Sequence, residues 1–106
     1  MNKKLKLLVH PGRILRETVF PDAGISVSEA ALALGESDQT LHNILAEQIP
    51  LSAALCLKIA RLFSSSPEMW IRLQASYDLQ QAMLNEAVAE SLSHIVPITP
   101  RYKALA

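Results

Sequence analysis

Apolar residues recur at helical spacing in successive segments of the chain. Starting at Val27 they occupy positions i, i+3, i+4 and i+7, and the same spacing returns from Cys56. This repeat matches the 3.6-residue turn of an α-helix and gives each segment one face suited to burial. The whole pattern predicts an all-α fold of five helices, with an extended C-terminal helix and a short extended tail.

The boundaries of the first two helices follow from proline, glycine and a capping pair. Pro11 suits the first turn of a helix, and the stretch 20–24 (FPDAG) is expected to form the turn that ends it. Ser26 and Glu29 have the spacing of a capping box, which satisfies free amides at a helix start. Gly35 is expected to end this second helix.

The third helix completes a recognisable unit. Ser37 is its expected N-cap, and Pro50 forbids continuation beyond Ile49. Because no glycine follows it, we expect this helix to lack a left-handed cap and to run on to Gln48. Its inward face comprises Leu41, Ile44 and Leu45, and its outward face Asp38, Gln39, His42, Asn43 and Ala46. A helix, a glycine turn and a second helix form the helix-turn-helix pattern.

The C-terminal half is expected to contain two helices and a tail. Ser52 caps the fourth helix, and Ser66 with Pro67 opens the fifth, which meets no further glycine or proline until Pro97. Pro97 and Pro100 favour extended backbone before them, which predicts an extended tail or a short edge strand. We therefore divide the chain into a basic segment (1–9), a helix-turn-helix domain with a C-terminal dimerisation helix (10–92) and an extended tail (93–106).

Three stretches carry a more specific signal than helical spacing. They are HPGRILRETV (10–19), LGESDQT (34–40) and SSPEMWIRLQASYDL (65–79). In this order and spacing they resemble the HigA/VapI plasmid-maintenance antitoxins of the XRE, lambda-repressor-like class. The resemblance implies a small helical protein that binds a cognate toxin, usually an mRNA-cleaving toxin of the HigB type. It also implies a dimer that represses its own operon by binding double-stranded operator DNA.

Composition limits the function classes. A chain of 106 residues forms one domain, and its ten Lys and Arg balance ten Asp and Glu, so it is no general nucleic-acid coat. The lone Cys56 fits a reducing compartment and a small buried side chain. The apolar run near the amino terminus is too short for a signal peptide, and no stretch is long enough to cross a membrane, so we expect a cytoplasmic protein without membrane contact.

The outward face of the third helix is the expected DNA-reading surface. Gln39 and Asn43 can each pair with adenine in the major groove, and Asp38 can accept a hydrogen bond from cytosine N4. Phosphates are expected to meet the amides at the helix starts and the basic residues Lys3, Lys4, Lys6, Arg13 and Arg16. The expected DNA contacts are Ser37, Asp38, Gln39, Thr40, His42 and Asn43, together with Arg13 and Arg16.

The charge of this unit favours a second interpretation. Between Ile25 and Pro50 there are four acidic residues and no lysine or arginine, although members of the resembled family commonly carry a basic residue at the site of Asp38. The polar positions would then be a solvated helix face. The chain would be a protein-interaction antidote, or a stand-alone XRE regulator, with weakened or altered DNA binding.

The fifth helix carries more apolar residues than one face can bury. Trp70, Leu73, Tyr77 and Leu84 form one stripe, while Met69, Leu79 and Met83 lie on another flank. Exposed apolar patches of this kind mark interfaces, so we expect a homodimer, the alternative being a tail that folds back over the helix. The expected dimer interface is formed by Leu79, Met83, Leu84, Ile95, Val96 and Ile98.

Catalytic chemistry is not expected. The three histidines are far apart and belong to no zinc motif, and no nucleophile or phosphate-loop motif is present. We therefore expect no enzyme, cofactor or metal. For the HigB-like toxin, a purely electrostatic contact with the basic amino-terminal segment would be repulsive, so we expect an apolar or strand-like contact. We expect it on the first helix, the alternative being the tail, whose Ile95, Val96 and Ile98 could add an edge strand to a partner.

Overall fold

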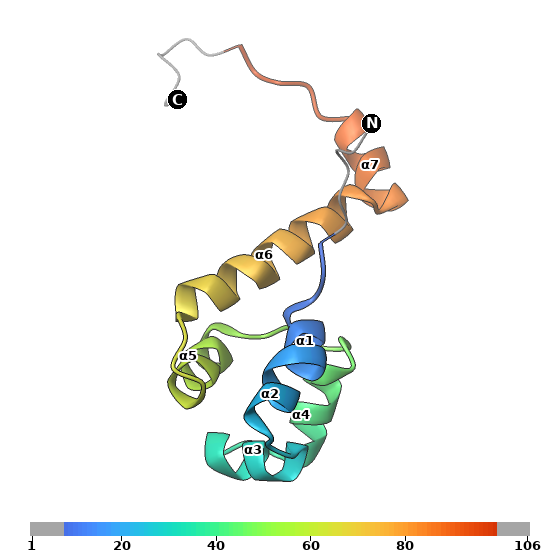
Figure 1. Ribbon diagram of the computed structural model, residues 1–106. Helices are drawn as coiled ribbons and strands as arrows, with labels where there is room; N and C mark the ends of the chain where they lie inside the picture. Colours follow the sequence, from blue (N-terminus) through green and yellow to red (C-terminus); the bar gives the residue numbers. More distant parts are fainter. Residues whose placement is uncertain (1–7, 100–106) are drawn as a thin grey trace.

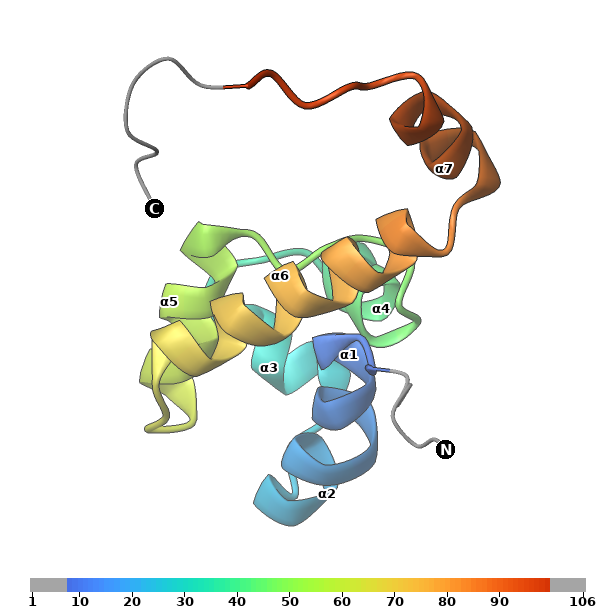
Figure 2. The ribbon, with the colours of Figure 1, turned by 90° about the horizontal axis from the view of Figure 1, so that it is seen from above.

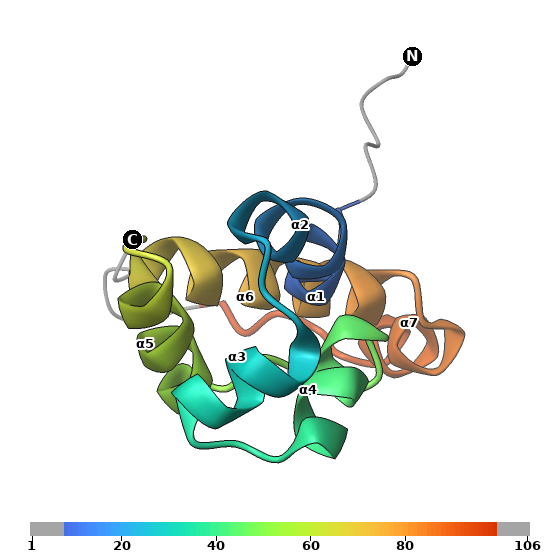
Figure 3. The same cartoon turned by 60° about the horizontal axis from the view of Figure 1, so that its bottom comes forward.

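The computed structural model of the protein describes residues 8–99, in which every regular element is a helix, as expected (Figure 1). The elements are α1 (Pro11–Ile14), the π-helical η2 (Leu15–Val19), α2 (Phe20–Ala23), α3 (Val27–Leu34), α4 (Asp38–Leu45), α5 (Ala53–Leu62), α6 (Pro67–Met83) and α7 (Glu86–Ser93). Figure 2 shows α6 crossing the bundle, in contact with α5 and α1. In Figure 3, α3 and α4 lie together on the opposite side of the bundle from α6.

The first helix is longer than expected. The predicted turn at Phe20 is wrong, because α1, η2 and α2 form one continuous helical segment that passes through Pro21 and ends at Gly24, with φ of 65°. A proline ring inside a helix collides with the preceding turn and removes an amide donor. The wider π-helical turn, closed by the bond from Phe20 N–H to Leu15 O, directly precedes Pro21 and accommodates its ring.

The start of α3 has the capping box that its sequence predicts. The Ser26 hydroxyl accepts a hydrogen bond from Glu29 N–H at 3.1 Å, and the Glu29 carboxylate accepts one from Ser26 N–H at 2.9 Å. These bonds to the charged form lower the pKa of Glu29. Gly35 ends the helix with φ of 71°, also as expected.

The end of α4 differs from the prediction. The helix ends at Leu45 and does not reach Gln48, because Glu47 adopts the left-handed conformation, with φ of 64°. The amide of Gln48 then donates to Asn43 O at 2.9 Å, which closes the helix in the way a glycine usually does. A non-glycine residue in this conformation costs roughly 1–2 kcal/mol. Arg16 offsets part of the strain, since its Nη1 lies 3.2 Å from the Glu47 carboxylate.

The prediction of a single long C-terminal helix is also wrong. It breaks after α6, at Leu84, and Asn85 starts α7 by accepting a hydrogen bond from Val88 N–H at 3.1 Å. An asparagine side chain competes for backbone amides and therefore favours a helix start over a helix interior. The described residues thus form six helical segments, counting 11–23 once, where the sequence predicts five.

The core lies where α1, α4, α5 and α6 meet. Its largest fully buried side chains are Trp70, Leu15, Leu41, Ile44, Leu51 and Ile59. Trp70 anchors the start of α6, and its indole donates to Ser65 Oγ at 2.8 Å. In Figure 1, α7 and the described part of the tail extend from the far end of α6, and residues 95–99 form no strand. Among residues 8–99, the buried apolar side chains all lie between Pro11 and Trp70.

Candidate nucleic-acid interface

The second helix of the helix-turn-helix unit presents a polar face. Leu41, Ile44 and Leu45 are buried, as the sequence predicts, so α4 packs one side on the core. Asp38, Gln39 and His42 are exposed, while Thr40 and Asn43 are half-buried. The start of α4 therefore offers hydrogen-bonding side chains on a rigidly packed helix, which is the arrangement needed to read base edges.

Hydrogen bonds orient the side chains at the start of α4. Gln39 Nε2 donates to Asn43 Oδ1 at 2.9 Å, so the two amides lie together. Ser37 accepts from Thr40 N–H at 3.1 Å and caps the helix, as predicted. Asp38 Oδ2 accepts from Ser28 Oγ at 2.8 Å, which ties the carboxylate to the start of α3.

The two arginines expected to contact phosphates carry intramolecular partners. Arg16 lies 3.0 Å from the Glu17 carboxylate and also donates to Leu45 O at the end of α4. The hydrogen bond with Glu17 raises the pKa of Arg16, and the same bond lowers the pKa of Glu17. Arg13 lies 3.7 Å from Glu17. Both charges are thus partly neutralised before any DNA arrives. The lysines at positions 3, 4 and 6 lie outside the described residues.

Lys58 also lies near the helix-turn-helix unit, and the sequence analysis did not assign it a contact. Lys58 of α5 extends to Glu36, in the turn between α3 and α4, with 2.7 Å between Nζ and Oε2. The two residues are 22 positions apart in the sequence, so no local sequence pattern predicts the contact. It links α5 to the turn and partly neutralises a positive charge close to the start of α4.

His10 holds the loop that follows α4. Its Nδ1 accepts from Gly12 N–H at 2.8 Å and caps α1, so Nε2 carries the hydrogen and donates to Ile49 O at 3.1 Å. The ring is buried and packs edge-on against Tyr77 of α6, with 5.1 Å between centroids.

Gln74 supports the same loop from α6. Its carbonyl accepts from Leu51 N–H at 2.7 Å, and its amide nitrogen donates to Asp78 Oδ1 at 2.9 Å. Gln74 is only 4% exposed. His10 and Gln74 therefore hold the two ends of the segment 49–51, which connects α4 to α5. The sequence reasoning missed this role. The available signal was a polar residue within the inward stripe of a helix, between Trp70 and Tyr77.

Other chemistry finds little support in the part of the chain that the structure describes. No group of three or more His, Cys, Asp or Glu side chains is close enough to hold a metal ion there. Cys56 is buried, and burial raises the pKa of its thiol, which keeps it unreactive. Within residues 8–99, no helix is both long and apolar enough to cross a bilayer.

These features define a helix-turn-helix protein: a capped first helix, a tight glycine turn, and a second helix that buries one face in the core and exposes a polar one. No family model matches the sequence. Virulence-associated protein I of Dichelobacter nodosus is 33% identical over 91 residues, which span 86% of the chain and 82% of that protein. The antitoxin HigA-1 of Vibrio cholerae is 28% identical over 79 residues, or 74% of each chain.

Solved structures give the same result. The antitoxin GraA superimposes with a TM-score of 0.80 at 32% identity, over 88% of this chain and 99% of GraA. The Pseudomonas aeruginosa antitoxin HigA, solved with the higBA promoter, has a TM-score of 0.77 at 33% identity, over 86% of this chain and 98% of HigA. The chain belongs to the HigA/VapI family of helix-turn-helix antitoxins, as the sequence motifs indicated.

Proposed function

We propose that this protein is the antitoxin of a HigBA-like type II module, which represses its own operon through α4 and neutralises an mRNA-cleaving toxin in the cytoplasm. The observation that carries the proposal is the rigid polar face at the start of α4, in a fold shared with antitoxins solved on DNA. GraA in complex with its operator has a TM-score of 0.80 with this chain, at 31% identity.

Base reading is assigned to three side chains of α4. Gln39 and Asn43 are joined by a hydrogen bond, and together they can offer donors and acceptors to one or two adenines once that bond opens. Asp38 keeps one oxygen on Ser28 and has a second with which to accept from cytosine N4. Ser37, Thr40 and His42 flank this group and are proposed to contact phosphates or neighbouring bases.

Replacing both amides should remove sequence discrimination. Each lost bidentate contact costs about 1–3 kcal/mol, so Gln39→Ala with Asn43→Ala should bind the promoter roughly 30-fold or more weakly, with little change on unrelated DNA. Fluorescence anisotropy on both duplexes measures the difference. Equal selectivity in the parent and the double variant would contradict this reading surface.

A matched change in the opposite direction is Asp38→Arg. It removes a repulsive charge and adds one phosphate contact, which should tighten binding to unrelated DNA, where Asp38 reads no base, about tenfold near 0.1 M salt. The gain should shrink as salt rises, and Asp38→Asn should show a smaller gain. No gain at low salt would mean that residue 38 faces away from DNA.

We also propose a homodimer formed through α6. Leu79 and Met83 are 63% and 68% exposed. Leu79 follows Trp70 by nine residues, or about two and a half turns, so it lies on the helix face opposite to the buried tryptophan. Leu84, Ile95, Val96 and Ile98 are exposed as well, and they extend the apolar surface beyond α6. A second copy buries this surface and places two α4 helices on one operator.

Toxin neutralisation is assigned to a surface other than α4, with the first helix as the proposed contact.

Co-expression with the toxin tests whether the chain is an antitoxin and whether neutralisation is independent of base reading. The intact chain should restore growth to cells that express the toxin encoded beside it, and Gln39→Ala with Asn43→Ala should restore growth equally well. Absence of rescue by the intact chain would remove the antitoxin function and leave a stand-alone regulator.

A second candidate function is a toxin-binding antidote with weakened DNA binding. It is favoured by one observation, namely that Glu17, Glu36 and Glu47 already neutralise the cations nearest to α4. For this candidate, rescue by the intact chain would persist while its binding to the promoter matched its binding to unrelated DNA.

A further inference from the structure

The side chain of Asp38 is held where two helices begin. Asp38 is the first residue of α4, and its Oδ2 accepts a hydrogen bond from Ser28 Oγ at 2.8 Å. Ser28 is the second residue of α3. The two residues are ten positions apart in the sequence, so the bond joins the first turns of both helices of the helix-turn-helix unit.

The backbone on each side of this bond is fixed by capping and burial. The capping box of Ser26 and Glu29 closes the first turn of α3, and the adjoining Ala30 is fully buried. Ser37 caps the first turn of α4, where Leu41 is fully buried. An aspartate side chain has only two rotatable bonds, so a fixed backbone and one hydrogen bond determine where its carboxylate points.

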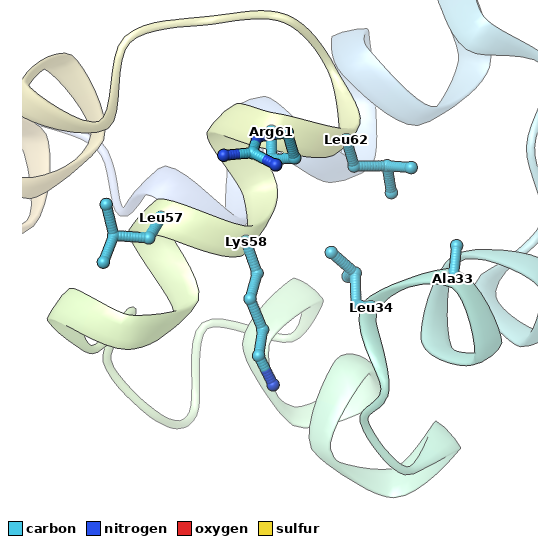
Figure 4. A pocket seen from close by; sticks show the side chains of 6 residues that line it. All are labelled: Ala33, Leu34, Leu57, Lys58, Arg61 and Leu62. Atoms are coloured by element: carbon cyan, nitrogen blue, oxygen red, sulfur yellow. The ribbon is translucent and has the colours of Figure 1, made fainter.

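The Asp38 carboxylate keeps its negative charge uncompensated. Among residues 8–99 it forms no ion pair. Lys58 of α5 extends towards the helix-turn-helix unit (Figure 4), but it pairs with Glu36 at 2.7 Å. The Ser28 hydroxyl donates a hydrogen bond without removing the charge, and the second carboxylate oxygen stays able to accept.

An ionised carboxylate accepts hydrogen bonds and donates none. In the major groove, cytosine presents only the N4 donor, adenine adds an acceptor beside its donor, and thymine O4 and the guanine edge are acceptors. A carboxylate that is fixed towards the groove therefore favours cytosine and repels thymine. A mobile carboxylate turns towards water when it meets the wrong base, and so discriminates less.

We propose that Ser28 is a positioning residue for base reading, because its hydroxyl directs the Asp38 carboxylate into the major groove and makes cytosine the preferred base there. The proposal rests on the DNA reading assigned to α4 in the proposed function. It adds a residue of α3 to the specificity of that helix, and Ser28 needs no DNA contact of its own.

Binding to a set of altered promoter duplexes tests the proposal. Each base pair of the promoter fragment is changed in turn, and fluorescence anisotropy gives the affinity of every duplex. Asp38→Ala identifies the base pair that Asp38 reads, since its preference should disappear only there. The parent should bind about tenfold more weakly when that cytosine is changed to thymine. In Ser28→Ala the factor should fall to about threefold, while preferences at the other positions stay unchanged.

Further variants distinguish positioning from a general effect on the fold. Ser28→Thr keeps the hydroxyl and should restore the tenfold preference. When Asp38→Ala is already present, adding Ser28→Ala should change no base preference further, because Ser28 acts through the carboxylate. Ser91→Ala is the matched control, since it removes an exposed serine hydroxyl from α7 and should bind every duplex as the parent does. Circular dichroism confirms that each variant is folded.

The outcomes separate this proposal from DNA reading as a whole. A parent chain that bound its promoter no better than unrelated DNA would overturn both. A selective parent whose Ser28→Ala variant kept the full preference for cytosine would overturn the positioning role alone, and so would an Asp38→Ala variant with unchanged preferences. Equal weakening of all duplexes by Ser28→Ala, with or without Asp38→Ala, would show instead that Ser28 contacts a phosphate.

Discussion

Gly12→Ala should destabilise the protein more than any other single methyl addition among its described glycines. A Cβ at Gly12 would overlap the carbonyl oxygen of Ile44, a backbone atom inside α4. The helices α1 and α4 must then separate at the centre of the core. Overpacking of this kind costs about 3 kcal/mol, which should lower the melting temperature by roughly 15 °C. Urea unfolding and a thermal scan measure both values.

Gly24→Ala is the matched control for this substitution. Gly24 has φ of 65°, but no neighbouring atom lies near its added Cβ. Alanine there should cost only about 1 kcal/mol, because the strain is confined to one residue's backbone. If both variants lost the same stability, the close approach of α1 to α4 would not be the reason for glycine at position 12.

Charge on the outer face of α6 should abolish both dimerisation and tight operator binding. In Leu79→Glu with Met83→Glu, two carboxylates would be buried without partners in the interface, so light scattering should report a mass of 11.6 kDa at micromolar concentration. Linking two reading helices raises affinity by about 10²–10⁴, and the monomer should lose that factor on the promoter.

Two controls separate this effect from unfolding. Leu32→Glu, on an exposed leucine of α3, should keep the parent's mass. Trp70→Glu should unfold the chain, since Trp70 is 2% exposed and packs in the core. A double variant that remained dimeric would show that α6 is not the interface.

Much of the fold could be read from the sequence because its signals are local. The capping box of Ser26 and Glu29, the Ser37 cap and the left-handed Gly35 depend on residues a few positions apart. The buried face of α4 follows from spacing in the same way. The flanking motifs identified the family, although they did not reveal what their side chains do.

The predictions that were wrong involve competition between local preferences. Pro21 was expected to stop a helix, yet a π-helical turn lets the helix continue. Glu47 has no intrinsic preference for the left-handed conformation, and it adopts that conformation where the chain must turn towards α5. Asn85 starts a new helix where the absence of glycine and proline predicted an uninterrupted one.

The sequence by itself determined the helical class, the capped starts of α3 and α4, the polar face of α4 and the family, since each is encoded in the identity and spacing of nearby residues. Only the tertiary structure decided how α4 is held and how its surroundings are charged. His10 reaches Ile49 across 39 residues, Gln74 reaches Leu51 across 23, and Lys58 reaches Glu36 across 22. Such pairings depend on which helix faces pack together. Packing in the core decides this, and local sequence patterns, which specify single helices, do not.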